Sequence, residues 1–99
     1  MKIRPSPIVA LNRAMALAEH VGPERGLEAI STIEDLERLG SYPFYPAALG
    51  ELELRIGRTD SAKAHFRSAK QLARNDGERR YLEQRILDCD RSSQPRFSR

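Results

Sequence analysis

The segment 45–74, YPAALGELELRIGRTDSAKAHFRSAKQLAR, restricts the possible fold more than any other part of the chain. Its apolar spacing predicts two helices joined by a short turn at Gly57. Small residues at Gly50 and Ala62 would let the two helix backbones approach closely, and Phe66 is large enough to fill the space between them. The segment therefore predicts a tightly packed pair of antiparallel helices.

A similar spacing occurs earlier in the chain and indicates an internal repeat. Three pairs of positions 36 residues apart match in character, and a fourth pair, Leu17 and Glu53, does not; the three are Ala14 with Gly50, Gly26 with Ala62 and Ile30 with Phe66. A 36-residue offset is close to the 34 residues of a tetratricopeptide repeat (TPR). The aromatic residue usual near the start of a TPR helix is absent, and Pro46 stands there. We therefore expect a second, weaker helix pair of TPR-like character.

Capping signals divide the chain into five expected helices, at about 7–20, 23–39, 44 or 46 to 56, 61–74 and 77–89. Gly40 is expected to end the second helix, Thr59 or Asp60 to cap the fourth and Asp76 to cap the fifth. The predicted fold class is all-α, a short right-handed TPR-like array of about five antiparallel helices. It would contain two helix pairs and a C-terminal capping helix, because such arrays end in a helix with one polar face.

Domain organisation and composition place the chain among small globular proteins. We expect an extended lead-in over residues 1–5, one helical domain over 6–90 and a disordered basic tail over 91–99.

The net charge of +3 is uneven: residues 1–18 carry +3, 19–53 carry −6 and 54–99 carry +6. Attraction within the fold or a directed electrostatic surface would both explain this. No apolar run predicts a membrane span, and the single cysteine fits a cytoplasmic protein.

The residues that commonly carry chemistry are scattered. His20 and His65 lie in no metal-binding motif, and Cys89 falls on the apolar line of the last predicted helix. The sequence contains no phosphate-binding glycine loop and no nucleophile motif. We therefore predict a protein that is not an enzyme, with no catalytic residues, no metal and no cofactor.

Two surfaces are candidates for binding. The ligand groove of a TPR array is lined by the first helix of each pair, which here gives Leu11, Asn12, Met15, Glu19, Phe44, Glu51, Leu54 and Arg55. Several of these residues could instead pack against a neighbouring helix. The second candidate is a basic stripe on the fourth helix, formed at helical spacing by Lys63, Arg67, Lys70 and Arg74. It could be a solvated face, a contact for an acidic protein or a contact for nucleic acid.

Several short strings resemble one protein family. They are Pro5-Ser6-Pro7 leading into Leu11-Asn12-Arg13-Ala14, Gly22-Pro23 with Gly26-Leu27, the connector at Tyr42, Leu54-Arg55-x-Gly57-Arg58, and Glu78-Arg79-Arg80-Tyr81-Leu82. Together they are similar to the C-terminal TPR-like domain of a group of bacterial extracytoplasmic-function (ECF) RNA polymerase sigma factors. The resemblance extends over about 85 of the 99 residues.

The resemblance implies transcription regulation through protein contacts, with sigma domains, RNA polymerase or a regulator as the partner. Such sigma factors carry their promoter-binding domains ahead of this one, so we expect no direct promoter recognition by this chain. It would be an excised domain or a stand-alone relative. The alternatives are a free TPR adaptor that binds a peptide, self-association into a homodimer through the exposed flank of the first or last helix, and a nucleic-acid accessory.

Overall fold

The computed structural model describes residues 6–93 of the 99-residue chain. These residues form five α-helices and one 3-10 turn, and no strand occurs among them. The elements are α1 (Pro7–Val21), α2 (Pro23–Ser31), η1 (Leu36–Leu39), α3 (Phe44–Ile56), α4 (Thr59–Leu72) and α5 (Asp76–Ser93). The all-α class predicted from the sequence is confirmed. The predicted lead-in, residues 1–5, lies outside the described residues.

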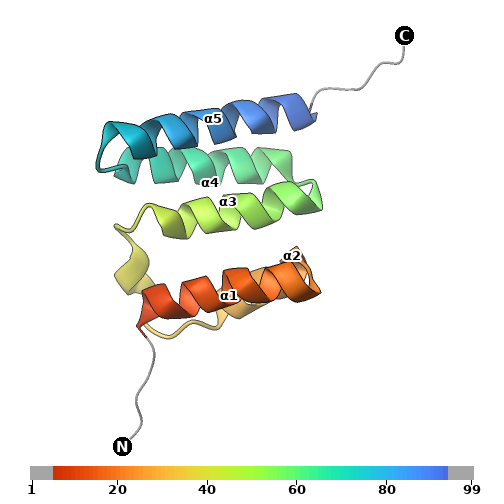
Figure 1. The fold of residues 1–99 in the computed structure, drawn as a ribbon, viewed down its shortest axis with the longest axis vertical. Helices are drawn as coiled ribbons and strands as arrows, with labels where there is room; N and C mark the ends of the chain where they lie inside the picture. Colours follow the sequence, from red (N-terminus) through yellow and green to blue (C-terminus); the bar gives the residue numbers. More distant parts are fainter. Residues whose placement is uncertain (1–5, 94–99) are drawn as a thin grey trace, which may run out of the picture.

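The helices are stacked side by side and alternate in direction (Figure 1). α1, α3 and α5 run one way, and α2 and α4 return the other way. Each helix packs on the one before and the one after it, and α1 also contacts η1 and α3. The α1–α2 pair therefore forms one end of the stack, and α5 lies at the other end.

The first helix begins where its capping signals predict. The Ser6 side-chain oxygen accepts a hydrogen bond from the backbone N–H of Val9 at 3.2 Å, and Pro7 occupies the first helical position. Gly22, at φ 106°, ends α1 and allows Pro23 to start α2 at once. Such a φ is unfavourable for a residue with a Cβ, so the sharp reversal depends on glycine.

The second helix is shorter than predicted, because it ends at Ser31 and not near Leu39. The hydroxyl groups of Ser31 and Thr32 donate to the backbone oxygens of Glu28 and Ala29 at 2.7 and 2.8 Å, which competes with continued helix geometry. Asp35 then adopts the left-handed conformation at φ 59°, and the chain resumes as the 3-10 turn η1. Gly40 follows η1 in a right-handed conformation, so it ends this 3-10 turn and not the second helix as predicted.

The α3–α4 pair is the close helix contact that the sequence predicts. Gly57, at φ 95°, ends α3 and begins the reversal. A Cβ added to Gly50 would lie 2.9–3.0 Å from three ring atoms of Phe66, whose side chain is fully buried. The small residue therefore makes room for the ring. The predicted caps of α4 are wrong: α4 begins at Thr59 itself, and no side chain caps it.

The last helix begins and ends differently from the prediction. Asn75, and not Asp76, caps α5, because its side-chain oxygen accepts from the backbone N–H of Glu78 at 2.8 Å. α5 extends to Ser93, so residues 91–93 are helical and do not belong to the disordered tail predicted for 91–99. Residues 94–99 lie outside the described part of the chain.

Two hydrophobic clusters hold the stack together. The first joins α1, α2, η1 and α3 around Leu11, Ile30 and Leu52. The second joins α3, α4 and α5 around Phe66 and Leu82. Because α3 contributes to both clusters, it is the central element that places α1 and α5 on either side of it. None of the helices within residues 6–93 is long and apolar enough to cross a membrane.

Candidate functional site

A groove runs over the side of the stack formed by α1, α3 and the start of α5. We call it the α1–α3–α5 groove; it has a volume of about 280 Å³ and is lined by Leu11, Asn12, Met15, Tyr42, Phe44, Ala47, Ala48, Glu51 and Tyr81. Five of the eight residues predicted to line a groove are among them: Leu11, Asn12, Met15, Phe44 and Glu51. The structure thus brings together most of a site assembled from two segments far apart in sequence.

The other three predicted groove residues lie elsewhere. Leu54 packs against the cluster of α3, α4 and α5, so it belongs to the interior between helices. Arg55 and Glu19 do not line the groove but form an ion pair across α3 and α1, with Nη2 and Oε2 2.8 Å apart. Both side chains are largely exposed, and an ion pair of this kind contributes about 0–1 kcal/mol to stability.

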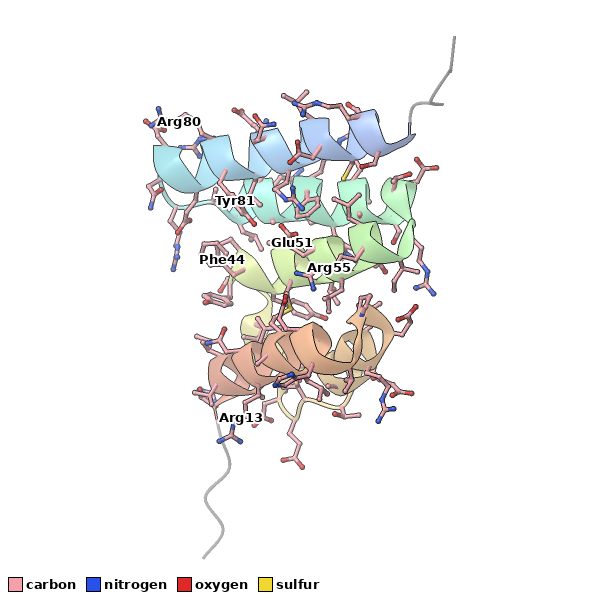
Figure 2. All side chains as sticks on the ribbon, turned by 45° about the vertical axis from the view of Figure 1, so that its right-hand side comes forward. Arg13, Phe44, Glu51, Arg55, Arg80 and Tyr81 are labelled. Atoms are coloured by element: carbon pink, nitrogen blue, oxygen red, sulfur yellow. The ribbon has the colours of Figure 1, made fainter. Side chains whose placement is uncertain are left out.

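Glu51 is the charged centre of the groove. Its carboxylate accepts two hydrogen bonds at 2.7 Å from Nε and Nη2 of Arg85, and one at 2.9 Å from the hydroxyl of Tyr81. Figure 2 shows Glu51 on α3 and Tyr81 on α5 close together on the same side of the stack. A two-pronged contact between a guanidinium and a carboxylate is among the stronger hydrogen-bonded pairs. Glu51 therefore ties α5 to α3, and its charge is neutralised within the chain.

The pKa values of the two α5 side chains reflect this contact. The hydrogen bond to Glu51 raises the pKa of Arg85, which keeps the guanidinium charged at all ordinary pH values. Burial, and then the hydrogen bond to the Glu51 carboxylate, raise the pKa of Tyr81 to about 12. Tyr81 therefore remains a neutral hydrogen-bond donor at physiological pH.

Aromatic residues form the wall of the groove near the connector between η1 and α3. The Tyr42 and Phe44 rings meet edge to face, with their centroids 5.6 Å apart. The Arg74 guanidinium lies 5.9 Å from the centroid of the Phe44 ring, so a cation covers one side of it. The connector aromatics thus pack against each other and also present ring surface to the groove.

Four residues that line the groove are not among the eight predicted ones: Tyr42, Ala47, Ala48 and Tyr81. Tyr81 is missed because the last helix is predicted only to cap the end of the array, whereas the first turns of α5 extend the groove. Its place in the string Glu78-Arg79-Arg80-Tyr81-Leu82 was a usable signal, because an aromatic ring usually buries much of its area and a purely solvated face does not need one. Ala48 offered no signal of its own.

The predicted basic stripe faces α5 and is largely neutralised there. Lys63 pairs with Asp90 at 2.5 Å, Lys70 with Glu83 at 3.1 Å and Arg74 with Glu78 at 2.6 Å. Among the described residues, Arg67 is the member of the stripe for which no ion pair is seen. Three of the four cations thus pair with acids of α5, but α4 ends at Leu72 and not at the predicted Arg74, so Arg74 belongs to the connection between the two helices.

The remaining candidates for chemistry lie apart from the groove. His65 Nε2 is 3.2 Å from Glu53 Oε1, which also accepts a hydrogen bond from the Ser61 hydroxyl. Cys89 is fully buried, and burial raises the pKa of its thiol. No group of three or more potential metal ligands occurs within residues 6–93.

Comparison with known proteins shows a similarity to a longer bacterial protein. An uncharacterized protein of Rhizobium meliloti (strain 1021) is 35% identical to this chain over 85 residues, which are 86% of this chain. The matched part is 20% of the Rhizobium protein, so this chain spans about a fifth of the length of its relative. No family model matches the chain, and no solved structure matches it significantly.

Proposed function

We propose that this chain is a non-catalytic, TPR-like interaction domain whose α1–α3–α5 groove binds a partner protein in transcription regulation. One observation carries the proposal: the charge within the groove is neutralised by the chain itself, which leaves an apolar and aromatic surface open. Glu51 is engaged by Arg85 and Tyr81, while Met15, Phe44 and Tyr42 keep exposed surface beside it. Such a surface suits the apolar side of a helix or an extended segment from another protein.

The spacing of the small residues supports the TPR-like part of the proposal. Ala14 and Gly50, Gly26 and Ala62, and Ile30 and Phe66 are all buried at matching places in the two helix pairs. The mismatched pair, Leu17 and Glu53, has a local explanation. The Glu53 carboxylate contacts the side chains of Ser61 and His65, whereas Leu17 has no such partners. A groove lined by the first helix of each pair is the surface that helical arrays commonly use for binding.

The resemblance to ECF sigma factors supplies the class of partner. We propose that the groove contacts sigma domains, RNA polymerase or a regulator of either, in the cytoplasm. The Rhizobium relative is about five times as long as the matched segment, so homologous residues there belong to a longer protein. That length is compatible with a regulatory domain attached to other domains.

A binding titration tests this function. The chain would be titrated with the purified promoter- and core-binding domains of an ECF sigma factor from the same genome. We expect a Kd in the micromolar range, as is common for transient regulatory contacts. Asn12→Arg, which places a long cation in the groove, should weaken binding at least tenfold.

His20→Arg is the matched control, because His20 is also an exposed polar residue of α1 but does not line the groove. It should bind like the unchanged chain. Failure to bind at about 100 µM, or equal loss with both variants, would contradict the proposal.

A further inference from the structure

The two ends of the stack differ in chemistry. The α1–α2 end carries a second, larger hollow of about 540 Å³ lined mainly by Ala10, Ala14 and Leu17 of α1 together with Ala29 and Ile33. Leu17 is 39% exposed, and Val21, one turn further along the same line, is 52% exposed. We call this surface the end face. It is separate from the α1–α3–α5 groove, which lies on the opposite flank of α1.

The other end of the stack is covered by polar side chains. The outer side of α5 presents Arg80, Glu83, Gln84 and Arg91, with Leu87 as its one large exposed aliphatic residue within the described part of the helix. Helical arrays need a polar outer surface on their terminal helices to remain soluble. α5 meets this requirement, whereas the end face leaves a row of aliphatic side chains in water.

We propose that the end face is a self-association surface, on which a second copy of this chain packs its own α1–α2 pair to form a four-helix contact. The contact is between like faces, because the polar outer side of α5 offers no apolar surface for a head-to-tail array. Pairing of like faces closes after two copies, so the expected product is a dimer and not a filament.

The charges around the end face fit a copy of itself. Arg13 lies on the α1 side, where it points away from the stack (Figure 2), and Glu34 lies on the α2 side. A two-fold axis parallel to the helices sets α1 of one copy against α2 of the other, which brings Arg13 toward an acidic side. A partner with charges of one sign only would meet repulsion on one edge.

The small residues and the size of the end face set the strength of the contact. The partly exposed alanines at positions 10 and 29 allow close approach of helices. The 15 residues of α1 make a helix about 22 Å long, and two neighbouring helices are about 20 Å wide. These dimensions give about 900 Å² buried in total over the two copies, which lies just under the lower limit for stable specific association and suits a weak contact. We therefore expect a weak dimer, with a Kd of about 1–100 µM.

Sedimentation velocity on the full chain, from about 1 to 500 µM, tests the proposal. The unchanged chain should shift from monomer to dimer over this range. Leu17→Glu should remain a monomer throughout, with unchanged helix content by circular dichroism. Leu87→Glu, the same substitution at the exposed leucine of α5, should dimerise like the unchanged chain.

Hydrogen exchange locates the contact independently of the variants. At high concentration, backbone amides of α1 and α2 should gain protection, and those of α5 should not. A chain that is monomeric at 500 µM would overturn the proposal, as would a dimer that survives Leu17→Glu or gains protection in α5. Loss of self-association would leave the groove and its Asn12→Arg test unaffected, so the two proposals fail separately.

Discussion

At the scale of single residues, the contact of Gly50 with Phe66 shows how far the sequence could predict the fold. The two residues lie 16 positions apart, and their sizes alone predicted a ring packed against a backbone. Gly57 likewise marked its turn. Glu51 was different, because its partners Tyr81 and Arg85 lie 30 and 34 residues away and their meeting depends on how α5 docks. No local pattern contains that information.

The Gly50 contact gives a stability prediction. Gly50→Ala should lower the free energy of unfolding by about 1–3 kcal/mol, because the new Cβ meets the buried Phe66 ring and overpacks the core. The better helix propensity of alanine offsets part of this, about 1 kcal/mol. Urea unfolding measures the difference. Gly77→Ala is the control: its Cβ would come no closer than 3.4 Å to Asn75 Oδ1, so that variant should be neutral or stabilised. Equal stability of the two variants would refute the close contact.

The Tyr81 hydroxyl gives a second prediction. Its pKa of about 12 lies above the ordinary value of 10, so its ionisation should appear near pH 12 when the chain is titrated by ultraviolet absorbance. Because the folded-state pKa is raised, Tyr81 favours the folded state below pH 10, and this contribution is lost between pH 10 and 12. Glu51→Gln should lower the pKa of Tyr81, though burial keeps it above 10. An unchanged titration in that variant would show that Glu51 does not contact the hydroxyl.

At the scale of elements, the helices were predicted better than their ends. Proline and glycine signals placed the starts of α1 and α2 correctly, and α3 begins at Phe44, one of the two starts predicted for it. The predicted end of α2 lies too far along the chain. The hydroxyl groups of Ser31 and Thr32 donate to backbone oxygens at the true end, and a periodicity of apolar residues carries no information about such hydrogen bonds. Three members of the basic stripe, Lys63, Arg67 and Lys70, lie on α4 as predicted, whereas Arg74 follows the end of that helix at Leu72. The pairing of the stripe with acids of α5 could not be predicted, because it depends on the relative rotation of two helices.

The junction of α4 and α5 gives a prediction on acid sensitivity. The Glu78 carboxylate accepts hydrogen bonds from the side chain of Arg74 at 2.6 Å and from its backbone N–H at 2.9 Å. These bonds hold the pKa of Glu78 below its ordinary value of 4.5. A lowered carboxyl pKa favours folding above about pH 4.5, and this contribution is lost as the pH falls through the folded-state value.

Thermal unfolding between pH 3 and 7 therefore tests the junction. Glu78→Gln should reduce the dependence of the melting temperature on pH below 4.5. Glu83→Gln serves as the comparison and should change the profile less, because the Glu83 side chain is 48% exposed and that of Glu78 only 13%. A larger effect of Glu83→Gln would contradict the role given to Glu78.

At the scale of the whole molecule, the described residues present three different surfaces: the α1–α3–α5 groove, the outer side of α5 and the end face. α3 contributes to both hydrophobic clusters and positions α1 and α5 on either side of the groove. α5 presents a polar outer side, and the α1–α2 pair presents an apolar one. Part of the uneven charge of the sequence is neutralised by ion pairs within the fold, because Glu19 pairs with Arg55 and Glu51 pairs with Arg85. Of the two explanations left open by the sequence, attraction between the acidic and basic segments therefore has direct contacts in its favour.

The most direct measurement of the central claim is an NMR titration of the isotope-labelled chain with the sigma domains used above. We predict that the largest shift changes fall on Met15, Phe44 and Tyr81, which line the α1–α3–α5 groove from three separate helices. Amides around Arg67 and Lys70 on α4 should change little. Shift changes centred on α4, with the groove residues unmoved, would contradict the claim that the groove is the interaction surface.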